Sequence, residues 1–304
     1  MSNRAFPAAP RFVDLDGHRV AVRTFGQGPD VFFVHGWPLH GATWRNVAPA
    51  LAEQFTCHLI DLPGCGATTL GSRPGTLTSH ADVVERVIDK LGIGRLALVG
   101  HDSGGAVARL AAASLGDRVF GLVVGDTEIA GYRPPALERL LTMIKIPGSG
   151  LLFSQMLRFG FMQKSSLGFG TCFDDTSIVD GEFGDLFIKP LYQSKEAADG
   201  QLALVRDFDW APLDNMEETH RRIVAPALLL WGVRDPWFPL RRAKKMVSQF
   251  AGGAELRELP GKLFVHEELP HLWAKHACEF LAASVDRQAT APRGETEQKH
   301  LTVS

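Results

Sequence analysis

The chain has 304 residues, of which 45% are hydrophobic, and this is enough apolar surface for one large α/β core. The formal net charge of −2 gives no electrostatic attraction to nucleic acid or to an anionic membrane surface. The four cysteines lack metal-ligand spacing, and no stretch approaches the roughly 18 apolar residues of a membrane span. We therefore expect a cytoplasmic protein that binds a small molecule, with no metal, nucleic acid or membrane as a partner. Association into a homodimer stays open.

Strand-like and helix-like segments alternate through the first 125 residues and again towards the C-terminus. The apolar runs predict strands at residues 20–25, 30–35, 57–61, 95–100, 119–125, 226–232 and 255–259. The helical patterns lie at residues 43–53, 79–91 and 269–285. Such alternation is typical of a mostly parallel sheet that is covered by helices on both faces.

A long segment of different character separates the strand at 119–125 from the strand at 226–232. Prolines and glycines interrupt it, and apolar residues then recur at helical spacing from Leu151 to Phe161. The segment is too long for a loop, and an insertion after the carboxyl end of a strand lies over the ligand crevice of an open α/β sheet. We therefore expect a helical cap, although an ordinary crossover with extra turns would also fit.

These patterns divide the chain into a core, an insertion and a tail. The expected parts are a core of residues 1–129 and 216–286, a helical cap of residues 130–215, and a disordered polar tail of residues 287–304.

The most informative segment is residues 96–105, where an apolar strand runs into a tight turn before an alanine-rich helix. Gly100 and Gly104 stand two residues before and two residues after Asp102, and small residues there let the backbone bend sharply. This frame presents Asp102 as a nucleophile that attacks an electrophilic carbon and forms an ester. A competing frame makes Ser103 the nucleophile, but it needs a bulky residue at the first small position. In a purely structural role, Asp102 would cap the helix.

Four motifs occur in an order and spacing that resemble the α/β-hydrolase superfamily, and within it the branch of epoxide hydrolases and haloalkane dehalogenases. They are His35-Gly36-Trp37-Pro38, Asp61-Leu62-Pro63-Gly64-Cys65-Gly66, Gly100-His101-Asp102-Ser103-Gly104 and Trp231-Gly232-Val233-Arg234-Asp235. The likeness covers roughly residues 10–285. It implies an α/β-hydrolase fold, a mostly parallel doubly wound sheet with an inserted helical cap, and a hydrolase that needs no cofactor.

The resemblance also implies roles for individual residues. Asp102 is the expected nucleophile, and the backbone N–H groups of Trp37 and Ser103 form the expected oxyanion hole. Epoxide hydrolases use two cap tyrosines as acids, and Tyr132 and Tyr192 are the tyrosines of this chain. We expect them to bind substrate, although both could equally pack with their hydroxyls at the surface.

The orienting acid and the base follow later in the chain. Asp235 stands where the family keeps the acid that orients its histidine, and Asp126 and Glu128 are a second possibility. The family's usual histidine position holds Leu263, and His266 comes three residues later. We expect His266 to be the base, oriented by Asp235. In the alternative, His266 is a solvated residue at the start of the last helix.

Several functions stay open at this point. The leading prediction is an epoxide hydrolase-like enzyme that acts through a covalent alkyl-aspartate ester on a small apolar substrate. The alternatives are a haloalkane or haloacid dehalogenase, a serine esterase or lactonase that uses Ser103, and a non-catalytic binding protein on the hydrolase fold.

Overall fold

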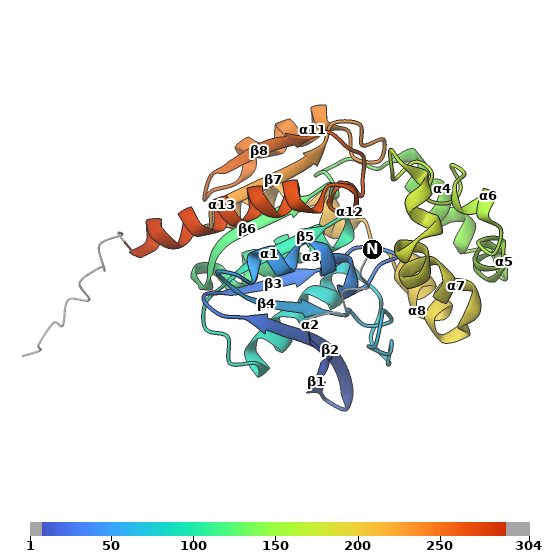
Figure 1. Cartoon of the computed structure of the whole chain (residues 1–304), viewed down its shortest axis with the longest axis horizontal. Coiled ribbons are helices and arrows are strands. Elements are labelled where there is room, and N and C mark those ends of the chain that lie inside the picture. Colours follow the sequence, from blue (N-terminus) through green and yellow to red (C-terminus); the bar gives the residue numbers. More distant parts are fainter. Residues whose placement is uncertain (1–7, 290–304) are drawn as a thin grey trace, which may run out of the picture.

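The computed structural model describes residues 8–289, which form one eight-stranded sheet with the order β1-β2-β4-β3-β5-β6-β7-β8 (Figure 1). The strands are β1 (Arg11–Leu15), β2 (His18–Gly26), β3 (Asp30–Val34), β4 (Thr56–Ile60), β5 (Leu96–His101), β6 (Val119–Gly125), β7 (Ala227–Gly232) and β8 (Ala254–Leu259). The β1–β2 and β2–β4 pairs are antiparallel, and the other neighbours are parallel. The expected mostly parallel sheet is confirmed, and β1 is an additional edge strand.

Helices cover both faces of this sheet because its central strands are apolar along their whole length. Every residue of β5, β6 and β7 is buried, as expected for parallel strands inside a doubly wound sheet. On one face, α1 (Ala48–Leu51) and α13 (Pro270–Ala289) pack against the strands. On the other face lie α2 (Leu77–Lys90) and α3 (Ser103–Leu115). Helix α3 thus follows β5 directly, and the turn between them lies at the carboxyl end of the sheet.

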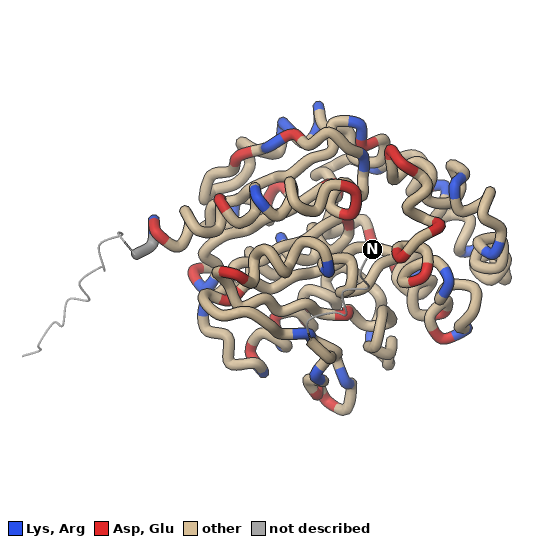
Figure 2. Tube along the Cα trace, viewed as in Figure 1, with Lys and Arg blue, Asp and Glu red and all other residues tan. Residues whose placement is uncertain are grey.

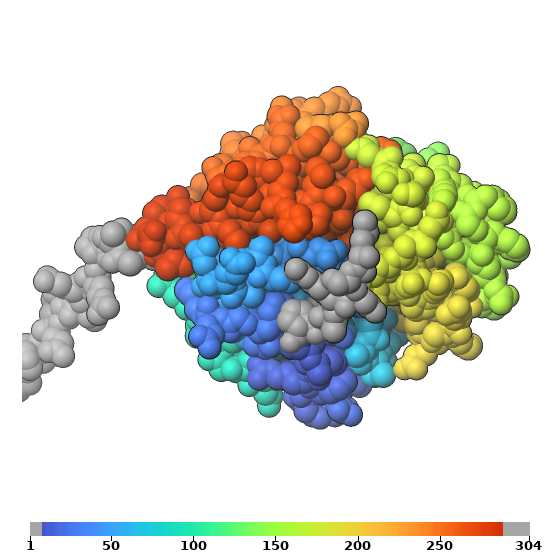
Figure 3. Space-filling view, viewed as in Figure 1, coloured from blue at the N-terminus to red at the C-terminus, as the bar shows by residue number. Residues whose placement is uncertain are grey.

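The segment between β6 and β7 is helical, and it lies beyond the carboxyl ends of the strands, at the right of Figure 1. The space-filling view shows it packed against that end of the core (Figure 3). Its helices are α4 (Pro135–Ile144), α5 (Ser149–Met156), α6 (Gly160–Gln163), η3 (Thr176–Asp180), η4 (Gly184–Ile188), α7 (Lys189–Gln193), α8 (Lys195–Arg206), α9 (Ala211–Asp214) and α10 (Met216–Arg222). We refer to residues 130–215 as the cap segment.

The remaining helices are short. They are η1 (Gly41–Asn46), η2 (Gly116–Arg118), α11 (Leu240–Met246), η5 (Val247–Gln249) and α12 (Val265–Glu268). The helix expected at residues 43–53 is split into η1 and α1, because Pro49 at the start of α1 has no N–H to continue a helix from η1. The expectation of disorder from residue 287 is wrong for residues 287–289, which continue α13. Residues 290–304 lie outside the described part.

Charged residues of both signs alternate along the described chain (Figure 2). None of the helices within residues 8–289 combines the length and the hydropathy that crossing a bilayer requires.

Candidate functional site

Asp102 occupies the turn between β5 and α3, with φ 52° and ψ −136°. A residue other than glycine is strained in this region, and such strain is typical of functional turns. The close packing of the turn requires glycine on both sides. A Cβ at Gly100 would lie 2.5 Å from the carbonyl oxygen of Gly104, and a Cβ at Gly104 would lie 2.3 Å from the carbonyl oxygen of His35. The turn therefore has the frame centred on Asp102, and Ser103 begins α3.

The two backbone donors that the sequence indicated meet the Asp102 carboxylate. The Trp37 N–H donates to Oδ2 of Asp102 at 2.9 Å, and the Ser103 N–H also hydrogen-bonds this carboxylate. The loop after β3 comes this close because Gly36 has no side chain, since a Cβ there would lie 2.5 Å from Asp102 Oδ2. The Ser103 hydroxyl lies 3.4 Å from the same oxygen. The structure thus brings Asp102, Trp37 and Ser103 together.

A buried cation supports this turn from α3. The Arg109 guanidinium donates to the carbonyl oxygens of Gly105 at 3.1 Å and Glu128 at 2.8 Å, and to the Thr127 hydroxyl at 2.9 Å. The Thr127 hydroxyl donates in turn to the Asp102 carbonyl oxygen at 2.8 Å. Sequence reasoning missed this network. The signal that could have revealed it is a lone arginine in an otherwise apolar, alanine-rich helix.

Arg109→Met is expected to lower the free energy of unfolding by about 3–5 kcal/mol, because it leaves buried acceptors without their cation. It also removes the positive charge that lowers the pKa of the buried Glu128 carboxyl against the larger effect of burial. Urea denaturation measures this loss. Arg118→Met is the matched control, because the Arg118–Asp89 pair is exposed and an exposed pair contributes about 1 kcal/mol or less. Similar losses in both variants would contradict a supporting role for Arg109.

Two further carboxyl groups lie beside Asp102. Asp126 follows β6, the neighbour of β5, and has φ 35°. Its Oδ1 accepts the Gly232 N–H at 2.7 Å. Asp235 follows β7, and its Oδ1 accepts the N–H of Trp237 at 2.7 Å and of the next residue at 3.2 Å. The carboxyl groups of Asp126 and Asp235 are hydrogen-bonded to each other. Three acids therefore stand in a row at the ends of three neighbouring strands.

The acids act on one another electrostatically. Burial and the negative charge of Glu128 raise the pKa of the Asp102 carboxyl well above its usual range, and Asp235 adds to this rise. The N–H groups of Ser103 and Trp37 act in the opposite direction. The fraction of Asp102 that is ionised, and can attack a carbon atom, therefore increases with pH over a range well above the usual one for aspartate.

The structure does not bring His266 to Asp235, so the expected hydrogen bond between them is wrong. His266 is fully buried on α12, and its Nε2 lies 2.8 Å from the Thr43 hydroxyl. The Thr43 hydroxyl donates to Glu267, which accepts a salt bridge from Arg45. These polar partners on η1 hold the imidazole away from the acids. The alternative that His266 is solvated is also wrong, because the ring is fully buried. Burial lowers the pKa of His266 well below the usual range.

Leu263, at the position expected for the family's histidine, lies in a loop whose backbone bonds to the segments that carry Asp102 and Asp235. The carbonyl oxygen of Leu263 lies 2.6 Å from Nε2 of His101, the residue before Asp102. Two residues earlier, the carbonyl oxygen of Gly261 accepts the N–H of Arg234, the residue before Asp235, at 2.9 Å. Leu263 itself is buried. A hydrophobic residue therefore stands at the position where the sequence resemblance placed the family's histidine.

The tyrosines and the cap contact the site in different ways. Tyr132 is half-buried, with the Arg242 guanidinium 4.4 Å from its ring centroid. Tyr192 is half-buried on α7. Within residues 8–289, no hydrogen bond joins either hydroxyl to Asp102. The Trp37 indole does reach the cap segment, because its Nε1–H donates to the carbonyl oxygen of Gln201 on α8 at 3.0 Å.

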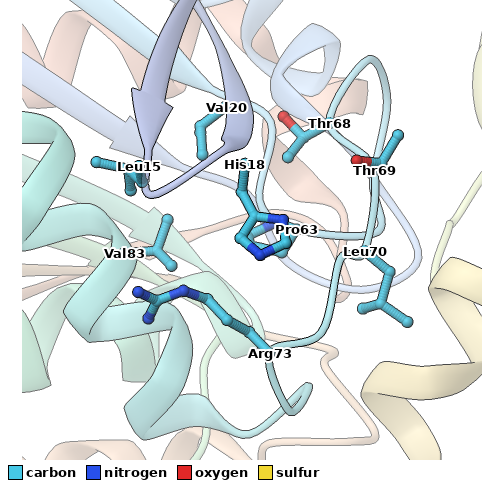
Figure 4. A pocket seen from close by; sticks show the side chains of 9 residues that line it. All are labelled: Leu15, His18, Val20, Pro63, Thr68, Thr69, Leu70, Arg73 and Val83. Atoms are coloured by element: carbon cyan, nitrogen blue, oxygen red, sulfur yellow. The ribbon is translucent and has the colours of Figure 1, made fainter.

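Two cavities lie near this end of the molecule. The larger has a volume of about 550 Å³ and lies between the core and the cap segment, with Pro38, His40, Phe187 and Gln201 among its lining residues. Pro38 and Gln201 connect it to the loop that carries Trp37. The smaller cavity lies under the β1–β2 hairpin, holds about 10 Å³, and is lined by none of the predicted site residues (Figure 4). It has room for about one water molecule, so it is no substrate site.

Known proteins resemble this chain over most of its length. A family model described as alpha/beta hydrolase fold matches residues 29–269. Haloalkane dehalogenase 2 of Mycobacterium tuberculosis is 26% identical over 272 residues, which cover 87% of this chain and 92% of that protein. Among solved structures, haloalkane dehalogenase DbeA from Bradyrhizobium elkani has a TM-score of 0.77 at 20% identity, covering 92% of this chain and 99% of that one. At this identity the likeness concerns the fold.

Two relatives match over shorter stretches. A pimeloyl-[acyl-carrier protein] methyl ester esterase of Aeromonas hydrophila is 38% identical over 105 residues, 34% of this chain and 40% of the esterase. The soluble epoxide hydrolase of a Corynebacterium species is 38% identical over 94 residues, 31% of this chain and 33% of that enzyme. The chain thus spans well under half the length of these two relatives.

Proposed function

The chain belongs to the alpha/beta hydrolase fold family, and from this membership we propose that it hydrolyses a small apolar substrate through a covalent ester on Asp102. One observation carries the proposal. The Asp102 carboxylate sits on the strained turn after β5 and receives the N–H groups of both Trp37 and Ser103. Once one carboxylate oxygen bonds to a substrate carbon, these donors face the other oxygen, the ester carbonyl. They then stabilise the charge that develops there when water attacks.

An epoxide is the first substrate class that we propose. Asp102 opens the ring at carbon, and the released oxygen needs a proton from an acid in the cap segment, for which Tyr132 and Tyr192 are the candidates. The half-buried position of both tyrosines supports this role. An alkyl halide is the second class, and the dehalogenase relative that matches 87% of the chain favours it. A halide leaves without a proton, so the two classes differ in their need for the tyrosines.

The serine esterase reading has less support from the geometry. A serine nucleophile needs a base to remove its proton. The neighbours of the Ser103 hydroxyl are the Trp37 N–H, which donates to it at 3.1 Å, and the Asp102 carboxylate. No imidazole of the described residues hydrogen-bonds this hydroxyl.

Covalent trapping tests the proposal. The protein is incubated with styrene oxide or with 1-bromohexane, quenched in acid and analysed by intact mass and peptide mapping. We expect the peptide that contains Asp102 to gain the whole epoxide, or the hexyl group after bromide has left. A single turnover in heavy-oxygen water then places the label in the same peptide, because water attacks the carbonyl carbon of the ester. An adduct on Ser103 would establish the esterase instead, and binding without any adduct or turnover would establish a binding protein.

A further inference from the structure

An ester on Asp102 needs a general base to activate water, and no imidazole of the described residues takes that place. His266 binds Thr43, and His101 binds the Leu263 carbonyl oxygen. The carboxyls that follow Asp102 along the sheet edge are those of Asp126, after the neighbouring strand β6, and of Asp235, after β7 beyond it. The question is whether this pair can accept a proton.

The pair has the contacts of two carboxyls that share one proton. Asp126 is fully buried and Asp235 is 6% exposed. Backbone N–H groups donate to Oδ1 of each carboxyl, and among the described residues neither buried Oδ2 has a hydrogen-bond partner outside the pair. The two carboxyl groups hydrogen-bond each other. Since a carboxylate has no donor, this bond exists only when one of the two is protonated.

The surroundings decide which carboxyl holds the proton. Asp235 receives two backbone N–H groups and Asp126 receives one, so the negative charge is better stabilised on Asp235. Burial and the charge of Asp235 raise the pKa of Asp126 well above its usual range, and burial raises the pKa of Asp235 to about 7. Asp126 is therefore the protonated donor, and Asp235 is the carboxylate that titrates near neutral pH.

We propose that Asp235, held by a protonated Asp126, is the general base that hydrolyses the Asp102 ester in place of the absent histidine. The inference rests on the proposed function. A water oxygen bonds to the carbonyl carbon of the ester while its proton passes to Asp235. The bond from that carbon to the oxygen that carries the substrate then breaks, and the leaving alkoxide takes the proton back from Asp235. Water and ester thus become an alcohol and a protonated Asp102 carboxyl, which keeps the second hydrogen of the water and loses it to solvent before the next turnover.

Other charged groups near the pair do not replace this role. The charge of Asp102 acts on Asp126, but it is absent once Asp102 is an ester. Glu128 and Arg109 act on each other, as burial raises the pKa of Glu128 and Arg109 lowers it. Cys172, from the cap segment, stays a neutral thiol because burial raises its pKa. The Asp126–Asp235 pair is therefore the group that titrates while the ester exists.

The decay of the adduct measures this step separately from its formation. Protein labelled with styrene oxide or 1-bromohexane is freed of excess reagent, and the adduct mass is followed at several pH values. In the unaltered chain we expect decay to accelerate with a midpoint at or below about pH 7, as Asp235 loses its proton. Asp235→Asn still forms the adduct but loses decay by about 10²–10⁴-fold, the usual contribution of a general base.

Two variants of Asp126 test its positioning role. Asn keeps a donor for Asp235, so Asp126→Asn is expected to retain decay and the pH midpoint of the unaltered chain. Leu removes the donor, and because this hydrogen bond lowers the pKa of Asp235, Asp126→Leu is expected to shift the midpoint upward. A merely structural role would not move the pH profile.

The outcomes separate the two proposals. An adduct that forms but decays at no pH would overturn the inference and leave the nucleophile standing. Decay that survives in Asp235→Asn but is lost in His266→Gln would also overturn it, in favour of the histidine. Failure of both reagents to label Asp102, in the unaltered chain and in Asp235→Asn, would overturn the proposed function, and the inference with it.

Discussion

Asp102→Asn is expected to abolish labelling by styrene oxide and 1-bromohexane, and to reduce turnover by at least about 10⁴-fold. An amide oxygen is a poor nucleophile, and no other carboxylate receives both the Trp37 and the Ser103 N–H groups among residues 8–289. Intact mass and steady-state turnover measure the two losses. Ser103→Ala is the control, and it should still form the adduct because the Ser103 N–H remains.

The same substitution should not weaken the fold. Asp102 is strained, and its ionised form is disfavoured by burial and by Glu128. A neutral amide removes this repulsion, so the free energy of unfolding is expected to stay the same or to rise by about 0.5–2 kcal/mol. Urea denaturation checks this. An adduct in Asp102→Asn, or a fold that collapses with the substitution, would contradict a catalytic role for this carboxylate.

Leu263→His is expected to accelerate decay of the Asp102 adduct by about 10²-fold or more. The backbone on either side of this position is bonded to the residues before Asp102 and Asp235, so an imidazole placed here lies between nucleophile and acid. The Asp235 carboxylate would stabilise the imidazolium that forms when water is deprotonated. The measurement is the adduct lifetime by intact mass.

A matched substitution separates chemistry from packing. Leu263→Met conserves volume and polarity at this buried position, so its adduct lifetime should stay near that of the unaltered chain. Equal lifetimes for Leu263→His and the unaltered chain would show that position 263 does not face the ester. The expected acceleration would instead show that the chain carries every part of a histidine-dependent site except the histidine.

The turn that carries Asp102 and its two backbone donors were predictable because their requirements are local. Gly100 and Gly104 place a glycine on both sides of an acid directly after an apolar strand, and the structure shows why a Cβ is excluded at both. The Trp37 loop follows a buried strand that pairs with β5, so its approach to Asp102 follows from the parallel sheet. Because β3 and β5 are neighbours in the sheet, the motifs that follow them in the sequence meet at the same edge.

The direction of His266 was not predictable, because partners far along the chain determine it. Its place beside Thr43 depends on the packing of η1 against α12, more than two hundred residues apart in sequence. The hydrogen bond between Asp126 and Asp235 likewise requires the relative height of two strand ends, which no residue pattern encodes. The role of Arg109 depends on partners that lie after β6, Thr127 and Glu128, and on α10, where its guanidinium contacts His220 at 3.1 Å.

Trp37 makes the chemistry of the site dependent on the seating of the cap segment. One residue offers its backbone N–H to Asp102 and its indole N–H to Gln201 on α8. A bound molecule that is too large keeps α8 away from Trp37 and breaks the hydrogen bond between the indole and Gln201. The Trp37 N–H, one of the two donors of the proposed oxyanion hole, is then no longer aligned with Asp102. Coupling of this kind is reciprocal, so an occupied Asp102 also holds α8 in place. Large and small molecules would then differ in their rate of reaction rather than in their affinity. Bulky molecules would enter, bind and leave unchanged.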